Sequence, residues 1–206
     1  MKYIIAFWLI ILLTNEGHSQ NLRNTSWGMS ENEVKNIESL ELFKRLEANQ
    51  NNIVLVYKDY MFGDTLQVWY QFLCDSLSSI TYYMKLSSTF EKPYDEMIKY
   101  LELLKKKYNE PIEVNWDSKD SESKSFLDNS YNKNEGMSLL FVTGDVNSIL
   151  YSWLTETTRI YLLIKGETMH VEGREFRYPK FSIIYRSYNF EKLQDKSQEL
   201  LVNNKF

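Results

Sequence analysis

The chain of 206 residues contains one cysteine, three prolines, seven glycines and two histidines. A single cysteine excludes an internal disulfide framework, and the scarcity of proline and glycine excludes collagen-like and flexible-linker classes. Two histidines are few for a metal site built on several histidine ligands, or for a catalytic site in which histidine activates a nucleophile. With 43% hydrophobic, 15% aromatic and 25% charged residues, the composition is instead that of a globular protein with a packed core.

The sequence also lacks a hydrophobic run of the roughly 18 residues that a membrane-spanning helix needs. The apolar run after Lys2, residues 3–13, has the length of a signal-peptide core, and Gly17-His18-Ser19 supplies the small residues of a cleavage site. We therefore expect a signal peptide over 1–19 and a mature chain of 20–206 that is periplasmic or secreted. A bacterial lipoprotein would carry cysteine at the cleavage point, so no stable membrane anchor is expected.

Basic clusters are nearly absent as well. Cleavage removes one residue of each charge, Lys2 and Glu16, so the mature chain keeps the net charge of −4. One basic run, Lys105-Lys106-Lys107, follows acidic residues on a predicted helix and is expected to be a solvated helix face. Because nucleic-acid binders need a positive field, no nucleic-acid partner is expected.

The pattern of the first half predicts one helix and three strands. Ser30 and Glu33 have the spacing of a capping box and predict a helix over 31–38. Residues 40–50 have no clean period and fit either a helix end or a strand. An alternating pattern then predicts strands at 53–62, 66–74 and 78–86.

The second half repeats this arrangement. An apolar stripe after Pro93 predicts a helix over 93–108, and a polar stretch, 117–135, predicts a long mobile loop with a short turn around 138–143. Further strands are expected at 112–116, 149–153, 160–164 and 181–185, with a last helix at 190–201. The expected fold is α+β in two layers, an antiparallel sheet with helices on one face and the order α-β-β-β-α-β-β-β-β-α. It forms a single domain, or two similar halves at 20–90 and 91–206.

The alternation also predicts a strand register. The apolar residues of strands 66–74 and 78–86 lie on the same face of the sheet only under one condition. For every two residues directly opposite each other, the two residue numbers must add up to an even number. Placing Phe72 opposite Ile80 and Tyr70 opposite Tyr82 satisfies this rule and requires a loop of three or five residues. The other face then carries a polar surface with a central aromatic pair, a composition typical of a binding platform: Gln67, Trp69, Gln71, Thr81, Tyr83 and Lys85. The alternative is that residues 40–50 or the polar loop cover Trp69 and Tyr83.

Two short motifs resemble small bacterial envelope modules. Gly28-Met29-Ser30-x-x-Glu33-Val34 at a helix start, and Tyr108-Asn109-Glu110-Pro111 at a helix end, are similar to motifs of the SmpA/OmlA-type outer-membrane assembly proteins and the β-lactamase-inhibitor-like proteins. Asn109 replaces the glycine of those families, and the cysteine that would carry the lipid anchor of the assembly proteins is missing. The resemblance implies binding or inhibition by a sheet face, with no catalytic residues to carry over.

Motifs for chemistry are few. His170 is the sole histidine after cleavage and is expected to be solvated or structural, and Cys74 has no basic neighbours that would activate a thiol, so core packing is expected, with an intermolecular disulfide as the alternative. Asp117–Glu122 has the wrong spacing for a calcium loop, and the run that starts at Asp128 has Lys133 where glycine belongs. No metal and no cofactor are expected.

Together these patterns predict an exported, non-catalytic binding or assembly module of the bacterial envelope that binds through an open sheet face. Its expected partner is a protein segment or, alternatively, a carbohydrate. Two other functions stay open: a secreted enzyme such as a hydrolase with a carboxylate site that the sequence does not locate, and an inhibitor of a secreted enzyme. The pattern makes no prediction of oligomeric state.

Overall fold

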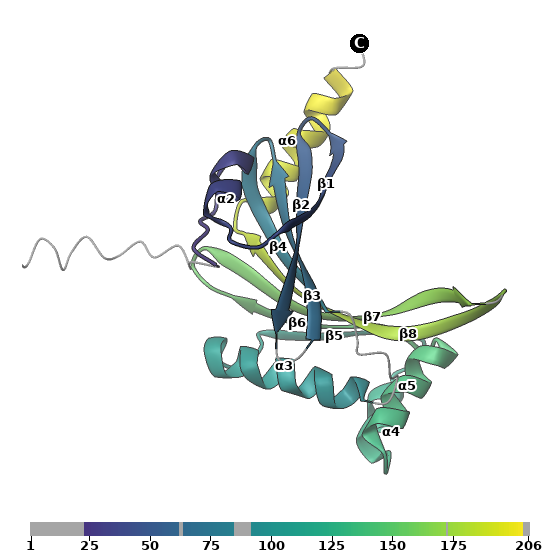
Figure 1. Ribbon diagram of the computed structural model, residues 1–206. Helices are drawn as coiled ribbons and strands as arrows, with labels where there is room; N and C mark the ends of the chain where they lie inside the picture. Colours follow the sequence, from purple (N-terminus) through teal and green to yellow (C-terminus); the bar gives the residue numbers. More distant parts are fainter. Residues whose placement is uncertain (1–22, 62–63, 85–91, 172, 204–206) are drawn as a thin grey trace, which may run out of the picture.

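In the computed structural model, which describes residues 23–61, 64–84, 92–171 and 173–203, one antiparallel sheet of eight strands is packed against five helices (Figure 1). The expected α+β class with an antiparallel sheet is confirmed. The helices are α2 (Glu31–Ile37), α3 (Pro93–Tyr108), α4 (Ser123–Asn129), α5 (Lys133–Thr143) and α6 (Phe190–Asn203). The strands are β1 (Leu42–Asn49), β2 (Asn52–Met61), β3 (Asp64–Leu73), β4 (Ser76–Met84), β5 (Glu113–Ser118), β6 (Val146–Leu154), β7 (Thr158–Val171) and β8 (Arg174–Ser187).

The element order corrects the expected one in two places. Residues 42–49, which the pattern left open, form the edge strand β1. The polar stretch expected to be a long loop contains α4 and the start of α5, and the expected turn at 138–143 is the second half of α5. The Asp120 carboxylate accepts from the Ser123 amide at the start of α4 (3.0 Å). The Asn132 side chain accepts hydrogen bonds from the amides of Asn134 and Glu135 at the start of α5, and Gly144, at a φ of 72°, ends that helix.

The strand order is β1-β2-β3-β4-β8-β7-β6-β5. Each half of the chain contributes four adjacent strands, and the two groups meet where β4 pairs with β8. At this seam Ile80 lies opposite Tyr185 and Tyr82 opposite Ile183. Apolar residues therefore continue across the seam on one face of the sheet.

The register between β3 and β4 keeps the predicted even sum but differs by two residues from the predicted pairs. Tyr70 lies opposite Ile80, and Val68 opposite Tyr82. The connection is a two-residue turn, Cys74 and Asp75, with φ values of 51° and 54°, the conformation that tight hairpins favour. A two-residue turn alone would place the apolar residues of β3 and those of β4 on opposite faces of the sheet. A register shift between Gln71 and Phe72 brings both sets to the same face. The expected loop of three or five residues was therefore wrong.

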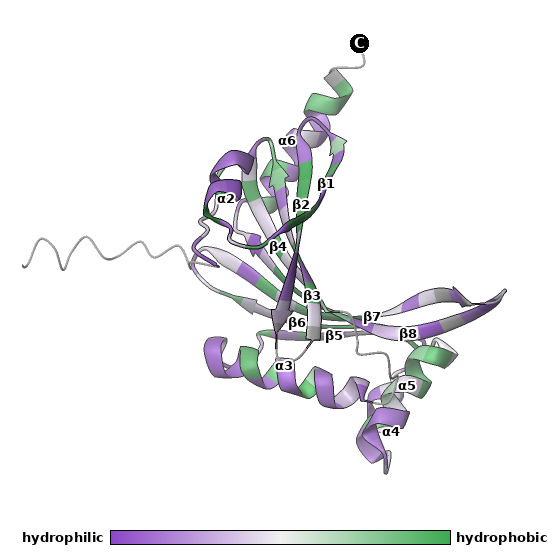
Figure 2. Cartoon of the chain, viewed as in Figure 1, coloured by the Kyte–Doolittle hydropathy of each residue, from purple (hydrophilic) through white to green (hydrophobic). Residues whose placement is uncertain are grey.

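The hydrophobic core lies on this face, which we call the first face. Val34 of α2, Leu101 of α3 and Phe141 of α5 are in the same buried cluster as the inward residues of the strands. Hydrophilic and hydrophobic residues alternate along α3, as its apolar stripe predicts (Figure 2). The strand residues of this cluster that are least exposed are Leu55, Val68, Tyr70, Phe72, Val146, Ile149, Ile160, Leu162, Ile164 and Phe181.

The opposite face, which we call the second face, is covered in part by α6. The guanidinium carbon of Arg186, which lies opposite Ser79 on this face, is 4.6 Å from the ring centroid of Phe190 at the start of α6. Further along the helix, the Ser197 hydroxyl donates to the carbonyl of Asn51 in the β1–β2 turn (3.2 Å). The expectation that helices cover one face is therefore corrected, because α6 crosses the end of the second face that holds this turn.

Candidate functional site

The predicted aromatic pair lies on the second face and its two rings are in contact. The ring centroids of Trp69 and Tyr83 are 4.7 Å apart, with an angle of 61° between the ring planes. The register places Tyr83 opposite Gln67 and Trp69 opposite Thr81, so the aromatic residues meet on a diagonal. Diagonal neighbours on a sheet are within reach of large side chains. Both side chains are partly exposed.

The polar residues predicted around this pair have different surroundings. Gln67 Oε1 accepts a hydrogen bond from the indole Nε1 of Trp69 (3.0 Å) and so fixes the orientation of the ring. Gln71 Nε2 donates to Asn52 Oδ1 (3.2 Å), near the β1–β2 turn. Thr81 is 9% exposed, so its side chain packs beneath the surface and has little area that a partner could contact. Lys85 lies outside the described residues.

Two lysines extend the surface in ways that the sequence did not predict. The Lys180 ammonium on β8 lies 5.2 Å from the ring centroid of Tyr83 and 3.0 Å from Glu167 Oε2. Lys58, which pairs with Gln67 across β2 and β3, has its ammonium 4.2 Å from the ring centroid of Phe43. Lys180 could not be assigned to the surface from sequence because the pairing of β4 with β8 joins segments about a hundred residues apart in the chain.

We call this set of residues the aromatic surface. It crosses strands β1 to β4 and β8 on the second face, beyond the end that α6 covers. Its members are Phe43, Lys58, Gln67, Trp69, Tyr83 and Lys180.

A separate polar cluster lies on the first face beneath α2. The Tyr70 hydroxyl donates to the Glu38 carboxylate, which also accepts from Arg23 Nε (3.2 Å), and Arg23 forms a second ion pair with Asp59. The Glu38 side chain is only 2% exposed. Burial acts to raise the pKa of Glu38, but the hydrogen bonds from Tyr70 and Arg23 outweigh it, and the pKa lies below its usual value.

This cluster is best explained as a structural network. Burial and the bond to Glu38 raise the pKa of Tyr70 far above that of a free phenol, so the hydroxyl keeps its proton. Every charge in the network has a partner of opposite sign. The cluster is a buried group of ion pairs whose charges are all matched. Removing one partner from such a pair lowers the stability of the fold by several kcal/mol.

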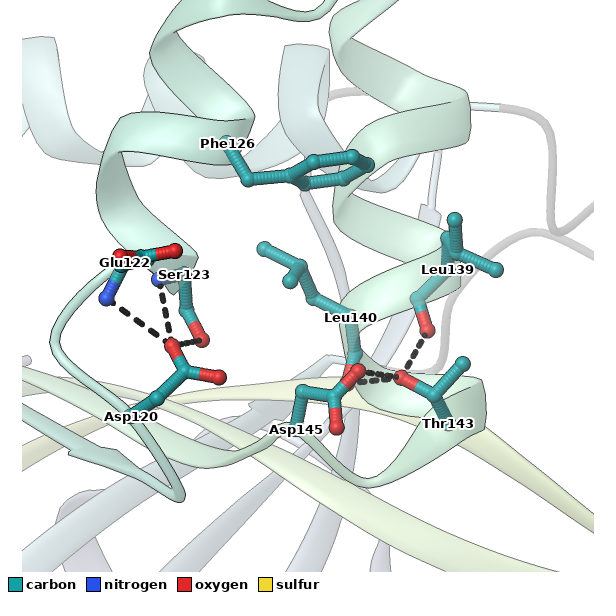
Figure 3. Close-up of a pocket in the computed structure, with 8 residues that line it drawn as sticks. All are labelled: Asp120, Glu122, Ser123, Phe126, Leu139, Leu140, Thr143 and Asp145. Atoms are coloured by element: carbon teal, nitrogen blue, oxygen red, sulfur yellow. Dashed lines mark hydrogen bonds between the residues drawn. The ribbon is translucent and has the colours of Figure 1, made fainter.

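An open hollow of about 250 Å³ lies between α4 and α5 (Figure 3). Two of its carboxylates accept hydrogen bonds from nearby residues: Asp120 Oδ1 from the amide of Ser123 (3.0 Å), and Asp145 Oδ2 from the Thr143 hydroxyl (2.5 Å). In the part of the chain that the structure describes, no group of three or more His, Cys, Asp or Glu side chains is arranged to hold a metal ion. The hollow is lined by Asp120, Glu122, Ser123, Phe126, Leu139, Leu140, Thr143 and Asp145.

The remaining candidate residues lie apart from both places. His170 is exposed on β7 opposite Glu175. Cys74 is the first residue of the β3–β4 turn and is partly exposed, so the expected packing of Cys74 in the core is corrected. The turn takes Cys74 out of the strand alternation, because both of its residues have positive φ.

Comparisons with protein-family models, with curated proteins and with solved structures gave no match. Among the described helices, none combines the length and apolar content of a membrane span.

Proposed function

We propose that the chain is an exported, non-catalytic binding protein of the bacterial envelope or the extracellular space, and that its partner docks on the aromatic surface. The observation that carries the proposal is the Trp69–Tyr83 pair: two large rings in contact with each other, partly exposed, on the face that lies opposite the main core. Tryptophan and tyrosine are the side chains that most often supply the central binding energy of an interface.

The surroundings of the pair support this role. Gln67 holds the indole in place, so little side-chain entropy is lost when a partner covers it. Lys58 and Lys180 stack on neighbouring rings at the border of the surface. Such an arrangement has an apolar centre and a polar rim that excludes water on binding.

Charge favours a partner segment that carries carboxylates. Although the whole chain has a net charge of −4, this region of the second face brings together Lys58, Lys165 and Lys180 with Glu167 as the acidic neighbour. Complementary charge at a rim raises the association rate and selects the partner more than it adds affinity. We therefore infer that the partner is a protein with an acidic segment next to an apolar contact.

The proposal is tested by the substitution Trp69→Ala. Loss of a central aromatic anchor weakens binding by roughly 2 kcal/mol, about thirtyfold, while the free energy of unfolding changes by less than about 1 kcal/mol. Proteins captured by the tagged wild-type chain and lost from the variant are identified by mass spectrometry, then purified and titrated by calorimetry.

The matched control is Tyr131→Ala, which removes a fully exposed aromatic ring from the connection between α4 and α5. It leaves the affinity unchanged. Equal capture by wild type and Trp69→Ala contradicts the proposal, as does unfolding of Trp69→Ala by about 3–5 kcal/mol, the cost expected of a core residue.

Export is proposed from residues 1–19, whose structure lies outside the described residues. The intact mass of the protein recovered from the periplasm or the medium is expected to fit a chain that starts at or near Gln20. A retained Met1 on a membrane-bound form contradicts this part of the proposal.

A further inference from the structure

Apolar side chains are exposed together around the hollow between α4 and α5. Phe126 is 45% exposed, Leu139 50% and Val142 54%. Phe126 and Leu139 line the hollow with Leu140, and in Figure 3 the Phe126 ring forms the wall opposite the carboxyl groups of Asp120 and Asp145. A group of exposed apolar side chains beside a hollow is typical of a contact site.

The residues that line this hollow carry negative charge, and two cations, Lys119 and Arg177, lie beside Gly144 at the end of α5. Three of its lining residues, Asp120, Glu122 and Asp145, carry carboxylates, and the hollow also adjoins the C-terminus of α5, where the helix dipole favours cations. Lys119 already occupies this position: its ammonium lies 3.4 Å from the carbonyl of Thr143 and 3.7 Å from Asp145 Oδ1. The Lys119 side chain is nevertheless 62% exposed, so an incoming cation can displace it.

We propose that the hollow binds a basic segment of a partner protein, inserting one large apolar side chain that is flanked by lysine or arginine. The apolar side chain contacts Phe126, Leu139 and Leu140, and the flanking cation meets Asp120 and Asp145. A volume of about 250 Å³ is smaller than the roughly 300–1,000 Å³ of sites for whole drug-sized ligands. It suits a single side chain, and exposed Val142 extends the contact along α5 beyond the hollow.

This site is distinct from the aromatic surface. The α5 helix packs on the first face, through Phe141 in the core cluster, whereas Trp69 and Tyr83 lie on the second face. The two surfaces also have opposite charge, so they select different segments. The peptide titration below and the Trp69→Ala capture experiment therefore test the two proposals separately.

The probe is a pair of synthetic peptides, acetyl-Gly-Lys-Phe-Lys-Gly-amide and the same sequence with both lysines replaced by glutamate. Each is titrated into the ¹⁵N-labelled mature chain, and amide chemical shifts are followed. The lysine peptide is expected to shift the amides of Phe126, Leu139 and Thr143 with a millimolar dissociation constant. The glutamate peptide is expected to bind at least tenfold more weakly. Phenethylammonium, added alone, tests whether a free amine binds as well as the segment does.

Four variants separate binding from folding. Asp120→Asn keeps an oxygen that can accept the bonds at the start of α4 and removes one charge, and we expect it to weaken the lysine peptide about two- to fivefold. Asp145→Asn acts in the same direction. Lys119→Met removes the competing cation and is expected to tighten binding about twofold or more. Glu199→Gln, the same charge change on exposed α6, is the control that leaves the affinity unchanged.

Three results would overturn the proposal. Equal affinity for the lysine and glutamate peptides shows that the carboxylates do not select the ligand. Phenethylammonium binding as tightly as the lysine peptide shows a small-molecule site in place of a docking site. Concentration-dependent self-association that Phe43→Ser or Lys58→Gln abolishes shows that a second copy of the chain, with its own stacked ring and ammonium, is the occupant.

Discussion

The carboxylate of Glu31 shows how single residues in this protein keep charges at partly buried positions. Arg45 Nε lies 2.8 Å from Glu31 Oε1, Arg45 Nη2 lies 3.1 Å from Oε2, and Lys35 lies 2.5 Å from Oε1 on the next helical turn. These hydrogen bonds, with that of Arg45 foremost, lower the pKa of Glu31 to about 2. The group thus joins β1, the edge strand, to α2.

This pKa predicts how stability depends on pH. Because the pKa of Glu31 is lower in the folded chain than its ordinary value of 4.5, the carboxylate stabilises the fold fully above about pH 4.5. The contribution is lost as the pH falls toward 2. We expect Glu31→Gln to cost about 1 kcal/mol at pH 7 and almost nothing at pH 2, measured by urea unfolding at a series of pH values.

The control for this prediction is Glu41→Gln, an exposed residue just before β1 that loses the same charge. Its effect is expected to stay below about 0.5 kcal/mol. A cost for Glu31→Gln that is the same at pH 7 and pH 2 would show that lost packing, and not the ion pairs, is responsible.

At the scale of elements, α2 is a short helix of seven residues and depends on its ends. The capping box that the sequence predicts is present: the Glu33 amide donates to Ser30 Oγ (3.3 Å), and the Ser30 amide donates to Glu33 Oε2 (2.7 Å). The helix carries Val34, which is completely buried in the core cluster. The cap therefore stabilises a helix that an isolated segment of seven residues would not form.

We expect Ser30→Ala to lower the free energy of unfolding by about 0.5–2 kcal/mol. Ser39→Ala, an exposed serine after the helix, is the comparison and is expected to be neutral. Denaturant unfolding measures both. If Ser30→Ala has the same midpoint and slope as the wild type, the box contributes nothing to stability.

Elements with a strong period were predictable, and those without one were not. The helix expected at 93–108 is α3 with the same bounds, because Pro93 and a stripe of buried residues define it. The helices α4 and α5 were missed because neither has a long apolar stripe. Caps made by Asn132 and Gly144 and contacts with the sheet stabilise α5, and α4 packs against α5. Strand β1 was left open because most of its residues are exposed at the edge of the sheet and show no alternation.

For the whole molecule, the seam between β4 and β8 decides how the halves unfold. Ile80, Tyr82, Ile183 and Tyr185 are buried there on the first face, so the core continues from one half to the other. A shared core couples the halves in one cooperative unit. We therefore expect one unfolding transition for the mature chain.

The test is Ile183→Ala, which removes apolar contact at the seam and is expected to cost about 2–5 kcal/mol. Hydrogen exchange at increasing denaturant follows the amides of β2 and β3 in one half and those of β6 and β7 in the other. Both sets are expected to lose protection together, in the wild type and in the variant. Exchange of one set while the other remains protected would show two independent units.

The sequence by itself determined the class of the fold and the faces on which the alternating residues of β3 and β4 lie. Side chains alternate along a strand, so Trp69 and Tyr83 had to share a face once Phe72 and Ile80 shared the other. The even-sum rule held through a turn and a register shift that the pattern did not anticipate, because burial of the apolar set determines register.

Only the tertiary structure decided which surfaces those faces form. The pairing of β4 with β8 brings Lys180 to Tyr83, α6 folds back over one end of the second face, and the packing of α4 against α5 creates the acidic hollow. The first two depend on contacts between segments far apart in the chain, and the hollow depends on how two neighbouring helices pack against each other. Neither kind of contact leaves a local periodic signal.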